Sequence, residues 1–357
     1  MNNLVIIGNG FDLAHNMKTS YNHFIDHLIK TQFKSKQLNN LFKETFDFNS
    51  SNDFATYYKT HVRMKNDYFH NGFLGNIMIK YMSNNWCDIE NKYFELLNPI
   101  TDNSDFKGKP KKLNTEFEII KNYLVDYLKT QEKQAKFIES YRKMFELVDS
   151  NETAILNFNY TNTLQSLYSH EIKGSKVIHI HGELSNPKNP IIFGYAANDE
   201  ESRELIDRGD NEYMRNIKKH LYKRTENEKL LTYYLKGTKD INVTILGHSC
   251  GLSDKLILNQ ILNEENVKSI NIFYYEEYEQ YFQAQVNIDR IMNNDDNFKK
   301  LTDFNSSHRM PQHNDTPDQQ EAFINYFKPI CEARKNKKQQ AFQERLRQEN
   351  RNKIKIR

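Results

Sequence analysis

Polar side chains that could do chemistry stand at the ends of two apolar segments. Asn159 follows residues 153–158 (TAILNF), and two histidines, His179 and His181, lie in residues 176–181 (KVIHIH). A neutral imidazole can accept a proton near pH 7, and an asparagine amide can hold a ribose hydroxyl or a water through both its donor and its acceptor. We therefore expect His181 to be a base that faces a cleft and the other histidine to be structural. Stabilisation of a turn is the alternative role for the asparagine.

The two histidines also have a spacing that metal sites use, because alternate residues of a strand share one face. A catalytic zinc needs a third protein ligand. The sequence contains no HExxH motif and no cysteine cluster that would supply one. We therefore expect no metal cofactor.

A glycine-rich turn follows the first apolar segment, residues 4–7 (LVII). Glycine adopts the dihedral angles that such a turn needs and leaves room for a ligand, so backbone N–H groups could approach a phosphate. The candidate residues are Gly8, Asn9, Gly10, Phe11 and Asp12. The dinucleotide fingerprint has a third glycine where this chain has Leu13. A plain tight turn is therefore the alternative.

A second glycine turn, residues 247–251 (GHSCG), fits the GxSxG pattern of a hydrolase nucleophile elbow. A hydrolase would need an acid and then a histidine further along the chain. His308 and His313, in a polar loop, are the available histidines. The other interpretation is a turn that lines a nucleotide pocket. A serine hydrolase with Ser249 as nucleophile thus stays open beside a nucleotide site.

The second half of the chain alternates between apolar strands and helices, which would position these residues. Including the first segment, the expected strands are residues 4–7, 153–158, 176–181, 190–195, 241–247 and 269–275. The expected helices are residues 199–236, 253–262 and 276–292. Apolar strands of this kind favour a mostly parallel sheet with helices on both faces, that is, an α/β fold.

Helical patterns fill the region between the first two strands. Aromatic-rich periodicity runs from residue 20 to about 103, and a long amphipathic pattern ends at Val148. Pro317 is expected to open a last helix. The predicted domains are an α/β core (residues 1–19 and 150–303), a helical insertion for sensing or assembly (20–149), and a C-terminal helix with a basic tail (304–357).

Composition narrows the class of protein. The 357 residues carry a net charge of +3, which gives no chain-wide argument for nucleic-acid or membrane binding. Residues 334–357 hold ten Lys or Arg and two Glu, so this basic end is a candidate for nucleic-acid contact, with a solvated helix as the plainer interpretation. Three widely spaced cysteines fit neither a disulfide framework nor a zinc site and indicate a reducing, cytoplasmic location. No apolar stretch is long enough to span a bilayer, so we expect no membrane contact.

Several segments, taken in order from residue 2 to about 275, resemble the bacterial abortive-infection family AbiH. They are LVIIGNGFDLAHNMKTSYNHF, WCDIE, NFNYTNT, HIHGEL followed by FGY, and ILGHSCGLSDK. The resemblance implies a cytosolic phage-defence protein that halts growth of the infected cell, with a phage-derived trigger as a partner.

The same order is more distantly similar to the Sir2-like, Rossmann-like fold. Asn159 matches the asparagine of the sirtuin Thr-Gln-Asn-Ile-Asp motif, and His181 matches the sirtuin His-Gly base. Gly247 and Ser249 match the Gly-Thr-Ser turn, whereas the first turn reads Gly-Asn-Gly-Phe-Asp in place of Gly-Ala-Gly-Ile-Ser. The chain lacks the zinc-binding CxxC pair, which argues against protein deacetylation. Sir2-like defence domains without that zinc module typically hydrolyse NAD.

The resemblance therefore implies that NAD is the substrate and that Asn159 and His181 cleave it to nicotinamide and ADP-ribose without a metal. The implied nucleotide-binding residues are Gly8, Asn9, Gly10, Phe11, Asp12, Tyr160, Gly247, His248, Ser249 and Asp254. A nucleotide-sensing module that binds without cleavage is a further alternative. Related defence proteins often assemble, so a homo-oligomer is expected by resemblance.

Overall fold

The computed structural model describes residues 2–31, 35–37, 40, 73–82, 89–97, 110–148, 150–197, 199–292, 294–305 and 308–355. Residues 54–62 of the predicted aromatic-rich helical pattern, and residues 86–88 of the WCDIE segment, lie outside those residues, so what was expected of them stays a prediction.

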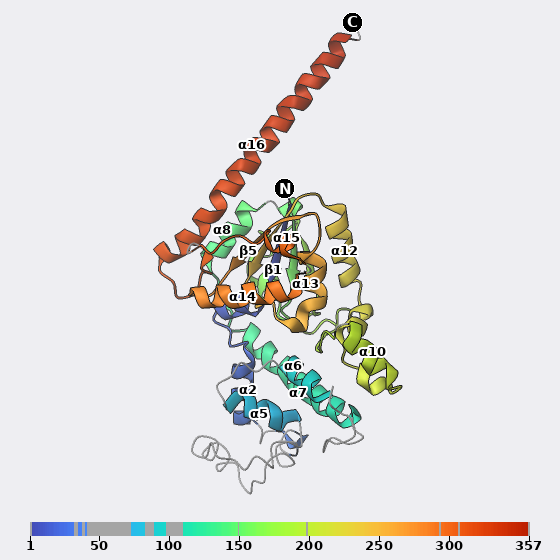
Figure 1. Cartoon of the computed structure of the whole chain (residues 1–357). Coiled ribbons are helices and arrows are strands. Elements are labelled where there is room, and N and C mark those ends of the chain that lie inside the picture. The colour runs from blue at the N-terminus through green and yellow to red at the C-terminus, as the bar shows by residue number, and fades with distance from the viewer. Residues whose placement is uncertain are drawn as a thin grey trace.

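Five parallel strands form one sheet, which confirms the predicted α/β class (Figure 1). They are β1 (Asn2–Ile7), β2 (Thr153–Asn157), β3 (Lys176–His179), β4 (Ile241–Leu246) and β5 (Val267–Phe273). Their order is β3-β2-β1-β4-β5, so the chain builds outward from β1 first to one side and then to the other. The crevice between β1 and β4, beyond their carboxyl ends, is where ligands bind in open sheets of this kind.

Helices of three groups surround the sheet. Before β2 lie α1 (Asn9–Ala14), α2 (Tyr21–Thr31), α5 (Phe73–Met82), α6 (Ile89–Leu97), α7 (Pro110–Glu132) and α8 (Glu139–Leu147). Between β2 and β5 lie α9 (Thr163–Tyr168), α10 (Asp199–Asp207), α11 (Lys218–Leu221), α12 (Asn227–Gly237) and α13 (Lys255–Leu262). After β5 come α14 (Tyr278–Ile291), α15 (Asp295–Phe298) and α16 (Pro317–Lys355). Short 3₁₀ turns are η2 (Ser150–Glu152), η3 (Asn211–Met214), η4 (Tyr222–Arg224) and η5 (Leu252–Asp254).

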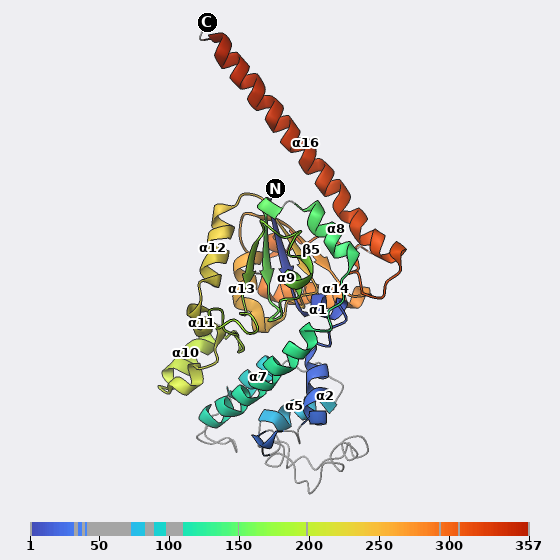
Figure 2. The same cartoon turned by 180° about the vertical axis from the view of Figure 1, so that it is seen from behind.

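Each face of the sheet is buried, because alternate residues of β1 enter different cores. Leu4 and Ile6 pack in a core that α12, α13 and α14 complete. Val5 and Ile7 pack in a second core with α1, α8, α9 and the start of α16. Figure 2 shows α8 and α12 on opposite sides of the strands. Burial on both faces explains why this strand is a continuous apolar run in the sequence.

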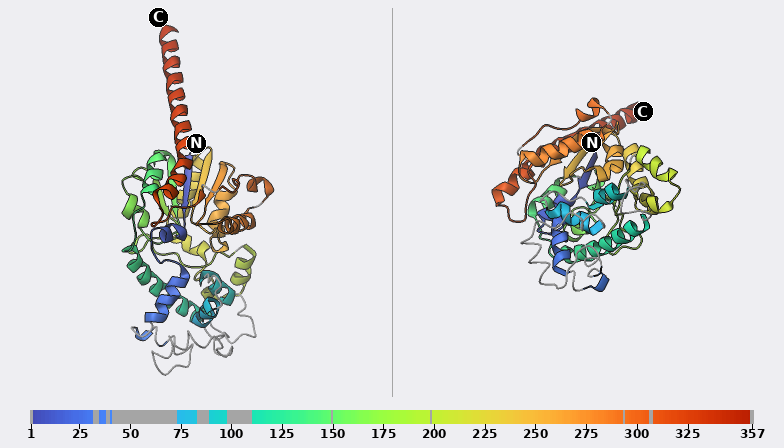
Figure 3. Two further views of the ribbon diagram at one scale, coloured as in Figure 1. Left: turned by 90° about the vertical axis from the view of Figure 1, so that its left-hand side faces the viewer. Right: turned by 60° about the horizontal axis from the view of Figure 1, so that its bottom comes forward.

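A third core belongs to the helices between β1 and β2. The rings of Phe73, Tyr93 and Phe117 pack there in edge-to-face and tilted pairs, at centroid distances of 4.2 to 6.3 Å. Figure 3 shows that α2, α5, α6 and α7 lie beyond the carboxyl edge of the sheet. We call these four helices the helical block. It faces the edge of the sheet where ligands of α/β proteins bind.

The predicted strand at residues 190–195 is wrong. In that range Tyr195 forms an isolated bridge with Ile217, and no strand is present. Its apolar side chains instead join two cores. Ile192 packs with Leu4 and Ile6 on one face of the sheet, whereas Phe193 packs in the core of the helical block. Burial between two cores therefore produced a strand-like apolar pattern without strand pairing.

Two predicted helices are each interrupted. The amphipathic pattern that ends at Val148 forms α7 and α8, which residues 133–138 separate. Residues 199–236 form α10, η3, α11, η4 and most of α12. The last helix, α16, begins at Pro317 as predicted, and Figure 1 shows it extending away from the body of the molecule. The domain boundaries given above stay predictions.

None of the helices in the described ranges is both long enough and apolar enough to cross a membrane.

Candidate functional site

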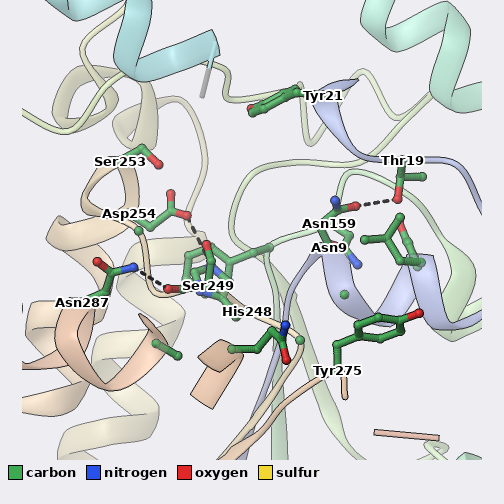
Figure 4. Close-up of a pocket in the computed structure, with 18 of the residues that line it drawn as sticks. Asn9, Thr19, Tyr21, Asn159, His248, Ser249, Ser253, Asp254, Tyr275 and Asn287 are labelled. Atoms are coloured by element: carbon green, nitrogen blue, oxygen red, sulfur yellow. Dashed lines mark hydrogen bonds and ion pairs between the residues drawn. The ribbon is translucent and has the colours of Figure 1, made fainter. Parts of the chain in front are cut away.

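A cavity of about 560 Å³ opens at the carboxyl edge of the sheet (Figure 4). Small-molecule sites usually measure roughly 300 to 1,000 Å³. The predicted site residues that line it are Asn9, Gly10, Asp12, Asn159, Tyr160, His181, Gly247, His248, Ser249 and Asp254. The fold thus brings together residues from four separate segments, as the sequence predicts.

Phe11 and Gly8 are the two predicted residues that do not line the cavity. The Phe11 ring is fully buried and packs 5.0 Å from the ring of Tyr141 and 6.3 Å from that of Tyr168. Gly8 packs against the second glycine turn, since a Cβ on it would lie 2.6 Å from the Cα of His248. Both residues therefore have packing roles, and the ligand contacts expected of them stay predictions.

The glycine turns are needed for their contact with each other. A Cβ on Gly10 would lie 2.7 Å from the Cα of Gly247, and a Cβ on Gly247 would lie 2.6 Å from the Cα of Gly10. The N–H groups of Gly8, Gly10 and Phe11 donate to the carbonyls of Leu246, Gly247 and Gly8 at 3.0, 2.8 and 2.9 Å. These three N–H groups are thus engaged within the protein and do not form the phosphate cradle that the sequence suggests.

Asn159 and His181 stand beyond the ends of neighbouring strands. Asn157 pairs with His179 at the last register position of β2 and β3, so each functional residue follows two positions later. The Asn157 side chain accepts from the N–H of Asn159 at 2.9 Å and so stabilises the turn. The turn is thus stabilised by Asn157, not by the Asn159 side chain. Nδ2 of Asn159 instead donates to the Gly8 carbonyl at 3.0 Å.

His179 is separated from His181, because the strand ends at His179 and the chain turns. The His179 ring contacts Gln165 on α9, whereas His181 lines the cavity. In the described ranges no group of three or more His, Cys, Asp or Glu is arranged to hold a metal ion.

A carboxylate joins two histidines in the wall of the cavity. Oδ1 of Asp254 lies 3.1 Å from Nε2 of His181, and Oδ2 lies 3.3 Å from Nε2 of His248. The N–H of Cys250 donates to Nδ1 of His248 at 2.9 Å, so Nε2 of His248 carries the hydrogen that faces Asp254. Tyr222 places its hydroxyl 3.2 Å from Nε2 of His181. An ionised Asp254 likewise selects the tautomer of His181 that has its hydrogen on Nε2.

A buried lysine holds this carboxylate. Lys218 has 0% of its surface exposed, and its Nζ lies 2.7 Å from Oδ1 of Asp254. The same Nζ lies 3.2 Å from Oε2 of Glu90 on α6 and donates to the Ser253 carbonyl at 3.0 Å. Glu90 also accepts from the N–H of Gly194 at 2.8 Å. One ammonium group thus links the helical block to the wall of the cavity.

Sequence reasoning missed Lys218, Tyr222 and Glu90. The lysine and the tyrosine lie in the region expected to be one helix, and nothing in its polar pattern marks a lysine for burial. Glu90 lies in the WCDIE segment, which contributed to the family resemblance without a role of its own. The WCDIE segment was therefore the sequence signal that could have pointed to Glu90.

The protonation states follow from burial and charge. Burial, followed by the nearby Lys218, lowers the pKa of His181 to about 4. Burial alone would raise the pKa of Asp254, but Lys218 and the two histidines hold it well below its usual range. At neutral pH the site therefore contains a neutral imidazole beside an ionised carboxylate. This arrangement resembles the oriented base of a general acid–base catalyst.

A second carboxyl group lies by the first turn. Burial raises the pKa of Asp12 to about 6, although Thr161 donates to its Oδ2 at 2.6 Å. Nearby, Thr19 donates to the side-chain oxygen of Asn9 at 2.5 Å, as Figure 4 shows. Asp12 thus titrates closer to neutral pH than an exposed carboxyl group does.

The contacts of Ser249 do not form a hydrolase triad among the described residues. Both ring nitrogens of the adjacent His248 are engaged by Cys250 and Asp254. His308 is buried against Phe273, with ring centroids 4.7 Å apart, and lies outside the cavity wall. The left-handed φ of the turn falls on Gly247 and Cys250, not on the serine. His313, the other histidine expected for a triad, does not line the cavity either, and no hydrogen bond joins the Ser249 hydroxyl to a histidine among the described residues.

Comparison with known proteins identifies the family. None of the curated proteins matches the chain. The model of the family described as "Bacteriophage abortive infection AbiH" matches residues 4–276. That range spans the sheet from Leu4 to the end of β5 and includes every predicted site residue. The chain therefore belongs to the bacteriophage abortive infection family AbiH.

Proposed function

We propose that this AbiH protein acts in abortive infection by hydrolysing NAD to nicotinamide and ADP-ribose. The observation that carries the proposal is the meeting of Asn159 with the His181–Asp254 pair in one cavity at the carboxyl ends of β2 and β3. The parallel sheet is compatible with the Sir2-like relationship that this reaction would imply.

The reaction breaks the bond between nicotinamide and C1′ of the ribose. Nicotinamide leaves with the bonding electrons, and the ribose passes through an oxocarbenium-like state that a water attacks at C1′. Nε2 of His181 donates its hydrogen to Asp254, so Nδ1 is the ring nitrogen that can take the proton from this water. That proton then passes to solvent, which completes the balance of the hydrolysis.

Asn159 would orient the ribose or the water. Its Nδ2 is anchored on the Gly8 carbonyl, which leaves Oδ1 as an acceptor for a hydroxyl group or for the attacking water. Charge in the wall supports the same reaction, because Glu90 and Asp254 share the single cation of Lys218. The excess negative charge would stabilise a developing oxocarbenium cation.

Nicotinamide release from NAD by the purified full-length chain tests the proposal. Asn159→Ala and His181→Ala should each lower the rate by roughly 10² to 10⁴, the usual contribution of a positioned acid or base. His179→Gln is the matched control, since it changes a buried histidine two positions away that does not line the cavity. Thermal melts would show that all three variants are folded.

Two results would overturn this function. One is a wild-type protein that never consumes NAD, even when it is isolated from phage-challenged cells. The other is an equal loss of rate in His179→Gln and His181→Ala. Binding of NAD without nicotinamide release would instead identify a nucleotide-sensing module.

A further inference from the structure

The distribution of cations around the cavity points to an anion subsite. Among the described residues that line the cavity, Arg290 on α14 is the only lysine or arginine. Lys218 lies behind the wall, where its ammonium group is fully buried and has three oxygen partners. A ligand with phosphate groups would therefore find one accessible, permanently charged side chain among these lining residues, that of Arg290.

Arg290 is held in place by a short chain of hydrogen bonds. Its Nη1 donates to Oδ1 of Asn287 at 3.2 Å, and Nδ2 of Asn287 donates to the Ser249 carbonyl at 2.9 Å. Figure 4 shows Asn287 reaching the turn that carries Ser249. The start of α14 is fixed by a capping box between Glu277 and Gln280. The guanidinium group is thus tied to the glycine turn after β4 while its residue stays exposed.

Three N–H groups of the first glycine turn are not available to a ligand. The N–H groups of Gly8, Gly10 and Phe11 donate to backbone carbonyls, so they are engaged before any ligand arrives. A guanidinium group presents several N–H donors in a plane and binds phosphate oxygens in pairs. Arginine is therefore the donor in this wall best suited to a diphosphate.

Sheet order separates Arg290 from the reactive residues. Asn159 follows β2, whereas Asn287 ties Arg290 to the turn after β4, and the order β3-β2-β1-β4-β5 puts two strand spacings between β2 and β4. Two spacings amount to about 10 Å. A ligand whose ribosyl end lies at Asn159 therefore reaches Arg290 with the groups that follow the ribose, as the diphosphate of a dinucleotide would.

We propose that Arg290, held by Asn287, forms the subsite for the diphosphate of a dinucleotide whose ribosyl end lies at Asn159. The proposal rests on the proposed NAD hydrolysis for the orientation of the ligand. The diphosphate subsite itself requires only that the cavity binds a nucleotide.

Calorimetric titration with ADP-ribose tests the subsite without relying on catalysis. Arg290→Ala should weaken binding roughly 10- to 100-fold, the usual effect of losing hydrogen bonds to a charged group. Arg290→Lys should weaken it less, since it keeps the charge and loses the paired geometry. Arg203→Ala on α10 is the matched control, because Arg203 is also exposed and does not line the cavity. It should bind ADP-ribose as the wild type does.

The possible outcomes separate the two proposals. Arginine-dependent binding of ADP-ribose by a wild type that releases no nicotinamide would support the subsite and reject NAD hydrolysis. Equal affinity of Arg290→Ala and wild type would overturn the subsite, whether or not NAD is cleaved. Failure of the wild type to bind ADP-ribose would overturn it as well.

Discussion

Nζ of Lys218 lies 2.7 Å from Oδ1 of Asp254, in a position from which solvent is excluded. The two charges therefore stabilise each other, and Glu90, which reaches the lysine from α6, further stabilises the ammonium group. Burying charges is costly unless they are paired and hydrogen-bonded, and here the ammonium group has three partners. The ionised state of Asp254, and with it the tautomer of His181, depends on this lysine.

Removal of the lysine should strongly destabilise the protein. Lys218→Met would leave the buried carboxylate of Glu90 and the largely buried carboxylate of Asp254 without their cation, for which we expect a loss of about 3 to 5 kcal/mol. Urea unfolding at pH 7 measures the change. Lys223→Met is the control, since Lys223 pairs with Glu228 at the surface and should show no measurable effect. A similar small change in both variants would contradict the described ion network.

The neutral state of His181 should make stability depend on pH. Its folded-state pKa of about 4 lies below its ordinary value of 6.5. Between these values the unfolded chain binds a proton that the folded chain does not, so stability falls as the pH falls from 6.5 to 4. Between pH 7 and pH 5, the wild type should lose about 2 kcal/mol more stability than His181→Gln.

Urea unfolding of both proteins at each pH measures this difference. Asp12, whose pKa burial raises to about 6, works in the opposite direction in both proteins and cancels in the comparison. Parallel pH profiles would show that the His181 imidazole does not stay neutral in the folded protein.

A methyl group should not fit between the glycine turns. Gly10→Ala would place its Cβ 2.7 Å from the Cα of Gly247, which is backbone and cannot rotate away. We expect a loss of about 1 to 3 kcal/mol from this overpacking. The control is Gly237→Ala at the end of α12, where an added Cβ would have no neighbour within 4 Å. Thermal or urea unfolding of both variants measures the loss of stability. A Gly10→Ala variant as stable as Gly237→Ala would refute the close contact between the turns.

Ser249 provides a test between two reaction types. If NAD is cleaved by way of Asn159 and His181, Ser249→Ala should lower kcat far less than Asn159→Ala does, because no histidine is placed on its hydroxyl. Rates of nicotinamide release at saturating NAD compare the two variants directly. A serine hydrolase would give the reverse order, with Ser249→Ala inactive and Asn159→Ala active.

Much of the sheet and its binding edge could be predicted because these features depend on local patterns. The apolar runs gave five strands with ends within two residues of those observed, and residues that follow strand ends met in one cavity. The roles of Gly8 and Gly10 could not be predicted, since they depend on a turn more than 230 residues away. The contact between Glu90 and Lys218 could not be predicted for the same reason, because the partners are 128 positions apart in the sequence.

The family match ends at residue 276, whereas the packing of the sheet continues beyond it. Phe323 and Phe327 from the first turns of α16 pack on Phe273, and Ile324 lies in the same core, which β1 and β2 share. The homologous segment is thus smaller than the unit that folds. A fragment that ends at residue 276 would expose the face around Phe273 that α16 covers, and it should aggregate. A fragment that ends at residue 333 would keep that face covered and would lack only the basic end.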